Sequence, residues 1–403
     1  MKLSKNRILK TVSVLTLSLL ILLVGILGVY DYIIPDNVSY FEGDELPVFL
    51  YAEASSLKFD NAEYMSCAEY RLFDFLPLKT VGLTSYYKDT KLIPGGMPFG
   101  IKFFTDGLMV AGFCDIDTDT GEVNPAKAAG LKLHDIITHI DGKAVSGTSS
   151  LSDAIDASRG AEITLTYMRD GSTHDVSITP IKSNGDGKYK TGIMIRDSGA
   201  GIGTVSFIVP ESGVFAGLGH GICDTETGSL IPMRRGAVVD VTISGIEKGL
   251  SGAPGEIKGF FKQTKLGSMI QNTDCGVFGV FTEVPANPLS EALPIGLKGE
   301  LKEGEATIYC TLDDSGMHAY TVSISDINKN ADGGKCFNVK VTDPALLEKT
   351  GGIIQGMSGS PIIQNGKLVG AVTHVLVNDP TRGYGIFIEN MLNAANIPMA
   401  KAS

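Results

Sequence analysis

Short apolar runs separated by glycine-rich turns fill most of the chain, and long segments with helical periodicity are scarce. The 49 glycines suit tight turns between strands, so the pattern predicts a mainly β fold. From residue 192 onward the expected strands follow one another at regular intervals, which favours a barrel or paired barrels. These strands cover residues 204–209, 213–218, 237–244, 306–312, 320–324 and 337–341.

The N-terminal segment departs from this pattern. An uncharged run from Thr11 to Tyr30 follows basic residues at positions 2, 5, 7 and 10. A run of this length can cross a bilayer as a helix, and basic residues ahead of it keep the N-terminus in the cytoplasm. A cleavable signal peptide is the alternative, but no Ala-x-Ala-like site precedes Asp31. We therefore predict a single-pass membrane protein with an uncleaved anchor and its remaining chain outside the cytoplasm.

Composition narrows the remaining function classes. The 403 residues are 43% hydrophobic and 20% charged, enough for two or three domains with sizeable cores. The net charge of −11, without a basic stripe, argues against nucleic-acid binding. The six cysteines are scattered and form no C-x-x-C pair, so no metal site and no cofactor is predicted. The sequence does not decide whether they pair, and small apolar packing is their default role.

A third pattern lies between the anchor and the strand-rich C-terminal half. A turn-rich stretch at residues 94–100 precedes an apolar strand, and residues 124–131 suggest a short helix closed by glycine. Residues 132–142 indicate a strand ending in an Asp-Gly turn. This order of elements resembles a bacterial PDZ domain; a generic small α/β domain is the alternative. The resemblance implies a peptide that adds to a sheet edge, with its carboxylate held by the loop Met97, Pro98, Phe99 and Gly100.

The hexapeptide at residues 356–361, Gly-Met-Ser-Gly-Ser-Pro, has the form G-x-S-G-x-P. It places Ser358 on a tight turn and can direct the N–H groups of Gly356 and Ser358 into one space, as an acyl-transfer site requires. Such clusters also mark ordinary loops. The sequence that follows favours the catalytic interpretation: two apolar runs flank an Asn365-Gly366 turn, which predicts a hairpin, and a short helix is expected from residue 389 to residue 395.

The succession of elements over residues 356–395 resembles the end of a trypsin-like serine peptidase. A serine nucleophile needs a base, and among six histidines His220 is our choice because it lies between two glycines and precedes Ser358. His374 is the alternative base. The orienting acid is the least determined member, with Asp343 first and Asp240 second. Gly352 lies six residues before Ser358, where trypsin-like enzymes carry a pocket charge, so no strong preference for a basic side chain is expected.

Taken together, these parts resemble the stage IV sporulation protein B peptidase family, and the resemblance spans nearly the whole chain. We divide it into a cytoplasmic tip and anchor (1–32), a membrane-proximal β-rich region (33–93), a PDZ domain (94–185) and a chymotrypsin-like β-barrel peptidase domain (190–403). The resemblance implies His220 as base, Ser358 as nucleophile and, less firmly, Asp343 as orienting acid.

The same resemblance implies a role. Members of this family are exported serine peptidases that act in sporulation, between the two membranes around the forespore. They cleave a membrane-bound inhibitor of an intramembrane metalloprotease, which permits activation of a late sigma factor, and they process themselves. Two alternatives stay open: an inactive PDZ scaffold in the cell envelope, and a protease that degrades misfolded envelope proteins broadly.

Overall fold

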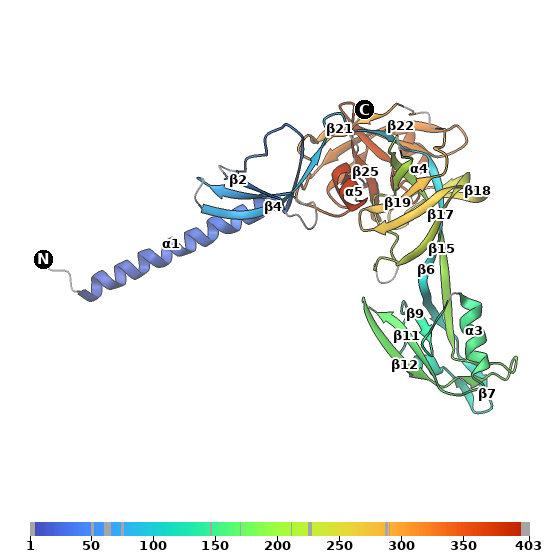
Figure 1. Cartoon of the computed structure of the whole chain (residues 1–403). Helices are drawn as coiled ribbons and strands as arrows, with labels where there is room; N and C mark the ends of the chain where they lie inside the picture. Colours follow the sequence, from blue (N-terminus) through green and yellow to red (C-terminus); the bar gives the residue numbers. More distant parts are fainter. Residues whose placement is uncertain are drawn as a thin grey trace.

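The N-terminal anchor forms a single helix, α1 (Lys5–Ile33), that extends away from the rest of the molecule (Figure 1). The computed structural model describes residues 5–49, 52–59, 66–73, 76–145, 147–169, 171–210, 212–224, 228–286, 289 and 291–395. Within α1, the candidate span Val12–Ile33 has a mean hydropathy of 2.7 and most of its side chains are exposed, whereas Tyr30 near its end is buried against the following sheet. A long, apolar helix with its side chains exposed fits a single-pass membrane span or a signal anchor.

A small four-stranded sheet follows the helix, as expected for the membrane-proximal region. Its strands run in the order β1-β4-β3-β2. Tyr70 and Val81 are fully buried in its core, where Ile34 joins them from the chain segment just after α1. The strands are β1 (Asn37–Phe41), β2 (Ala52–Phe59), β3 (Ser66–Leu72) and β4 (Leu76–Tyr86).

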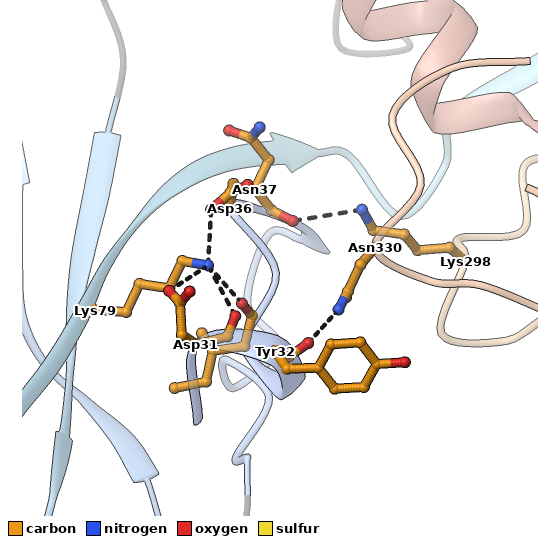
Figure 2. Close-up of polar contacts among 8 residues, drawn as sticks. Asp31, Tyr32, Asp36, Asn37, Lys79, Lys298 and Asn330 are labelled. Carbon is orange, nitrogen blue, oxygen red and sulfur yellow. Dashed lines mark hydrogen bonds and ion pairs between the residues drawn. The ribbon is translucent and has the colours of Figure 1, made fainter. Parts of the chain in front are cut away.

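Polar contacts fix this sheet both to the end of α1 and to the peptidase half (Figure 2). The Lys79 ammonium lies 2.7 Å from the Asp36 carboxylate and donates to the carbonyl of Ile34 at 2.9 Å. Asn330 donates its amide N–H to the carbonyl of Tyr32 at 2.6 Å. The Lys298 ammonium donates to the carbonyl of Asn37 in β1 at 3.4 Å, so the membrane-proximal sheet as well as the end of α1 contacts the half of the chain that carries the candidate nucleophile.

The first of two barrels closes through six strands. Successive pairing runs β6-β17-β18-β19-β16-β15, and β15 pairs back onto β6. Phe99 packs edge-on against Phe215 inside this ring, and both side chains are buried. The strands are β6 (Pro98–Phe113), β15 (Ile193–Ile208), β16 (Val214–Gly217), β17 (Met233–Glu247), β18 (Glu256–Thr273) and β19 (Gly276–Phe281). Two short strands, β5 (Lys91–Pro94) and β20 (Leu293–Pro294), extend the sheet beyond β15.

The second barrel is closed in the order β21-β22-β23-β26-β25-β24. The predicted hairpin is confirmed: β24 and β25 pair antiparallel, and Asn365 and Gly366 both have positive φ, 52° and 75°, as a tight hairpin turn requires. The elements are β21 (Gly304–Thr311), β22 (Met317–Ser325), β23 (Phe337–Val341), α4 (Pro344–Thr350), β24 (Pro361–Gln364), β25 (Lys367–Leu376), β26 (Asp379–Phe387) and α5 (Ile388–Ala395). The expected paired barrels and mainly β fold are confirmed.

The PDZ-like unit lies between the two long strands of the first barrel. Beyond the barrel, the outer halves of β6 and β15 continue as a pair into this unit, which has its own core around Leu108, Ile137 and Leu165 (Figure 1). Its further elements are β7 (Ile116–Thr118), β8 (Gly121–Val123), α2 (Pro125–Ala128), β9 (Ile136–Ile140), β10 (Lys143–Ala144), α3 (Thr148–Ala157), β11 (Ile163–Arg169), β12 (Ser172–Ile178), β13 (Ile181–Lys182) and β14 (Tyr189–Lys190).

The prediction that Met97, Pro98, Phe99 and Gly100 form a carboxylate-binding PDZ loop is wrong. Pro98 to Gly100 begin β6 and pair with residues 202–204 of β15 inside the barrel, so their N–H groups face neighbouring strands. Gly100 also pairs with Val239 of β17, and a β-carbon there would lie 2.5 Å from the Phe261 ring. The segment is a packed barrel strand, far from the groove of the PDZ-like unit.

Candidate active site

The two barrels meet at a cavity of about 390 Å³ that contains both His220 and Ser358. His220 comes from the first barrel, directly after β16, and Ser358 comes from the second, directly before β24. The cavity also receives the side chains of Ile353 and Ile354, and one wall is formed by residues 373–375 of β25. Residues 138 positions apart in the sequence therefore share one space, as the predicted pairing of base and nucleophile requires.

The turn at residues 356–361 has the shape that its sequence predicts. Gly356 and Gly359 have φ values of +98° and +99°, a backbone region that side chains rarely adopt. At Gly359 a β-carbon would also lie 1.9 Å from the Thr204 carbonyl oxygen. Ser360 is fully buried, and its hydroxyl donates to the Met357 carbonyl at 2.7 Å. Of the two serines in the turn, only Ser358 lines the cavity.

The backbone around Ser358 offers two N–H groups near the cavity. The carbonyl of Gly356 accepts a hydrogen bond from the Thr204 hydroxyl, and the carbonyl of Ser358 accepts one from the Thr204 N–H. Within the described part of the chain, the N–H groups of Gly356 and Ser358 have no hydrogen-bond partner. Two unused donors flanking a serine can stabilise a developing oxyanion.

His220 is presented by a sharp bend in the chain. Leu218 and Gly219 both have positive φ, 66° and 68°, so the chain turns away from β16 just before the imidazole. The ring Nδ1 lies 2.8 Å from the carbonyl oxygen of Gly221. Because a carbonyl only accepts, Nδ1 carries the proton in the neutral ring and Nε2 is left as the acceptor. A general base acting on a serine needs this tautomer.

The Ser358 hydroxyl donates to the Thr373 carbonyl at 2.5 Å in this structure. The same cavity holds the imidazole that would take its proton. Rotation of the serine side chain about its Cα–Cβ bond would exchange one acceptor for another. Catalytic hydrogen bonds are often incomplete without substrate, so this resting contact is compatible with a reactive serine.

His374, the alternative base, lies against His220. The two ring centroids are 4.6 Å apart with an interplanar angle of 34°. Burial, the His220 ring and Lys335 lower the pKa of His374 to about 4. Burial also lowers the pKa of His220, although the bond to Gly221 opposes the shift. Both imidazoles are therefore neutral at pH 7, so His220 is available to accept a proton.

The structure does not bring Asp343 to His220. One carboxylate oxygen of Asp343 accepts the N–H groups of Ala345 and Leu346 at the start of α4, at 2.9 and 3.2 Å, and the other accepts the N–H of Thr321 at 3.2 Å. These bonds make Asp343 the N-cap of α4. The sequence contained a signal for this capping role, because Asp followed by Pro at the first helical position marks a helix start.

The second choice of acid has a different partner as well. Asp240 lies on β17 and pairs with the Lys262 ammonium at 2.8 Å. Asp224, four residues after His220, pairs with His134 of the PDZ-like unit at 2.8 Å. In the described chain the His220 ring makes one hydrogen bond, which Nδ1 donates to the backbone carbonyl of Gly221. This partner of His220 was not predicted, because backbone carbonyls leave no mark in a sequence.

Cys223 is the one cysteine that lines the cavity among the described residues. Among the residues that the structure describes, the six cysteines form no disulfide. No group of three or more potential metal ligands lies together in the described ranges. Burial raises the pKa of the Cys223 thiol, which favours its neutral form.

Comparison with known proteins finds matches for two parts of the chain. The family model described as SpoIVB peptidase S55 matches residues 187–392, and a PDZ domain model matches residues 118–179. A curated protein of Haemophilus influenzae, "Probable periplasmic serine protease do/HhoA-like", is 44% identical over 54 residues, which are 13% of this chain and 12% of that protein. The chain thus spans less than a fifth of the length of the curated relatives it matches.

Two solved structures match parts of this chain. The Rv3671c protease from M. tuberculosis in its active form is 14% identical, with a TM-score of 0.29, and the match covers 51% of this chain and 77% of that one. The PDZ domain of the SdrC-like protein (Lmo2051) from Listeria monocytogenes is 25% identical, with a TM-score of 0.19, and the match covers 22% of this chain and 87% of that one.

Proposed function

Because the chain belongs to the SpoIVB peptidase S55 family, we propose that it is a membrane-anchored serine endopeptidase whose nucleophile is Ser358 and whose general base is His220. One observation carries this proposal: the turn at residues 356–361 places Ser358, with two unused N–H donors, in the same cavity as a neutral imidazole.

The reaction follows from these positions. The Ser358 oxygen bonds to the substrate carbonyl carbon while its proton passes to Nε2 of His220, and the N–H groups of Gly356 and Ser358 bind the resulting oxyanion. The imidazolium then gives its proton to the leaving amine, and water releases the acyl group by the same route in reverse. The Gly221 carbonyl holds the ring in the required tautomer throughout.

The cavity favours an apolar side chain on the substrate. Ile353 and Ile354 precede the nucleophile turn and line the cavity together with Val375 of β25. The buried Gly352 brings no charge into this region, which agrees with the expected lack of preference for basic residues. We propose cleavage next to an apolar residue.

We propose that the PDZ-like unit recruits a peptide at the edge of β15. Along residues 193–196 the only described strand that pairs with β15 is β6, so its other edge is open to an added strand. A cavity of about 580 Å³ lies beside it, lined by Ser152 and Asp156 of α3 and by Lys188 and Lys190. We propose this groove as the peptide-binding site, in place of the loop at residues 97–100 that was expected from the sequence.

The substrate, the signalling role and the location of the enzyme are also proposals. A membrane anchor next to a peptidase suits a membrane-bound substrate, and membership of the family suggests a regulatory protein cut in sporulation signalling. We propose that the catalytic half lies outside the cytoplasm, in the space between the forespore membranes, and that the enzyme also processes itself. Retention of the intact chain in carbonate-washed membranes tests the anchor.

Active-site labelling tests the proposed activity. Detergent-solubilised protein is treated with a fluorophosphonate, which reacts with activated serines, and Ser358→Ala should abolish labelling and cleavage without loss of folding. Ser360→Ala is the matched control, because its hydroxyl is buried in the same turn, and its effect should be much milder. An unlabelled wild-type protein that still binds peptides would instead identify an inactive PDZ scaffold.

Incubation with candidate membrane-protein ectodomains then separates the two kinds of protease. One or a few cuts in a single ectodomain, absent with Ser358→Ala, would support a signalling enzyme. Degradation of many unfolded proteins at comparable rates would contradict signalling and indicate envelope quality control.

A further inference from the structure

Thr204 is the one described residue whose hydrogen bonds reach both the nucleophile turn and the chain that leads to His220. It lies on β15 in the first barrel and is 1% exposed. Its hydroxyl donates to the Gly356 carbonyl at 2.7 Å, and its N–H donates to the Ser358 carbonyl at 3.0 Å. Its own carbonyl accepts the N–H of Leu218 at 3.2 Å, two residues before His220.

These bonds restrain the peptide planes that make up the oxyanion-binding turn. Each peptide unit is rigid, so a bound carbonyl fixes the direction of the whole plane. The Thr204 hydroxyl fixes the plane after Gly356, and the Thr204 N–H fixes the plane after Ser358. The N–H groups of Gly356 and Ser358 lie in the planes just before these and are joined to them through the Gly356 and Ser358 α-carbons, so fixing one plane limits the other. Gly356 is at φ +98°, where glycine moves freely, so the turn needs an external restraint to keep one conformation.

We propose that Thr204 is a positioning residue for catalysis: its hydroxyl holds the Gly356–Ser358 turn so that both oxyanion-binding N–H groups face the cavity. This proposal rests on the proposed serine peptidase function and adds a determinant that lies in the other barrel. Without the hydroxyl, the half-buried Gly356 carbonyl loses its partner and the turn is free to rotate. Misplacement of a donor by about 1 Å is enough to slow a reaction about 100-fold.

Ser206 provides a matched control on the same strand. It is also 1% exposed, and its hydroxyl has no hydrogen-bond partner in the described chain. Ser206→Ala therefore removes a buried hydroxyl from β15 without removing a bond to the nucleophile turn. Thr204→Val removes the bonding hydroxyl while keeping the shape of the side chain, and Thr204→Ser restores the hydroxyl.

The test measures fluorophosphonate labelling of the full-length, detergent-solubilised protein over a range of reagent concentrations. The maximal labelling rate reports the reactivity of Ser358, and the half-saturating concentration reports reagent binding. For Thr204→Val we expect the maximal rate to fall about 10- to 100-fold with little change in the half-saturating concentration. Thr204→Ser should label within about threefold of the wild-type rate, and Ser206→Ala should match wild type.

Different outcomes separate failure of this proposal from failure of the function. If Thr204→Val labels at the wild-type rate while Ser358→Ala does not label, Thr204 does not position the turn but the peptidase assignment stands. If the wild-type protein itself is not labelled, both the positioning role of Thr204 and the proposed peptidase function are refuted. If Thr204→Val does not fold, Thr204→Ala gives the same comparison, and equal rates for Thr204→Ser and a folded Thr204→Ala would overturn the role of the hydroxyl.

Discussion

Replacing Asp343 separates two roles that this residue could have, orienting the base or capping a helix. Its carboxylate accepts three backbone N–H groups: Ala345 and Leu346 at the start of α4 through one oxygen, and Thr321 through the other. Pro344 occupies the first position of that helix. Asn is as good an N-cap as Asp, but it carries no charge and cannot orient an imidazolium. Asp343→Asn and Asp343→Ala therefore have different expected effects.

The structure gives a magnitude for each change. Asp343→Asn keeps the capping oxygen and loses the acceptor for Thr321, which should cost about 1 kcal/mol. Asp343→Ala loses the cap as well, worth about 1 kcal/mol more, for a total of about 2 kcal/mol. In a domain of this size, each kcal/mol lowers Tm by about 2–4 °C. We therefore expect Asp343→Ala to melt about 4–8 °C below wild type and Asp343→Asn about half as far below.

Thermal unfolding and fluorophosphonate labelling of the same preparations decide between the roles. As the Gly221 carbonyl already orients His220, both variants should label close to the wild-type rate at temperatures where they are folded. Loss of an orienting acid typically lowers kcat about 10⁴-fold. A fall of that size in Asp343→Asn, with Tm nearly unchanged, would refute the capping interpretation and restore Asp343 to the catalytic centre.

Two further predictions concern buried titratable groups. Burial raises the pKa of Glu389, whose side chain is fully buried in α5, so the folded state binds its proton more tightly and loses stability as pH rises above about 4.5. Glu389→Gln should thus be stabilised over wild type more at pH 8 than at pH 4.5, measured by Tm, and an equal gain at both pH values would contradict this. The pH dependence of stability that His374 contributes has the opposite sign. Because the pKa of His374 is lowered in the folded state, stability is lost as pH falls from 6.5 toward 4, by on the order of 2 kcal/mol. His374→Gln should remove this loss of stability at low pH, measured as the free energy of unfolding in denaturant. An unchanged dependence of that free energy on pH would contradict the prediction.

Local sequence signals predicted the elements whose causes are local. The Asn365-Gly366 turn forms because these two residues tolerate positive φ, and apolar runs on both sides supply the strands. The 356–361 turn forms where two glycines adopt conformations that other residues rarely reach. The helix α1 was also predictable from local sequence, because its length and hydropathy are properties of a single segment. These local preferences are enough to predict that each element forms, although bonds from Thr204 in the other barrel restrain the 356–361 turn.

Signals that depend on a distant partner were read incorrectly or were absent. Residues 97–100 precede an apolar strand, and the same pattern serves a PDZ loop or a barrel strand; only pairing with β15 and β17, about a hundred residues or more away, decides between them. The role of Thr204 had no signal, because a threonine in an apolar strand is common. Asp343 had a local signal, its Asp-Pro helix start, which competed with its position after a strand.

The sequence by itself determined the nucleophile turn, its hairpin, the membrane-length helix and the mainly β fold, because each follows from backbone preferences and hydropathy within one segment. The tertiary structure decided which strands close each barrel, that the PDZ-like unit extends from two barrel strands, and that a backbone carbonyl contacts the base. Those features depend on which segments meet across long sequence separations. Hydrogen bonds between backbone groups carry no residue identity, so only the folded chain reveals them.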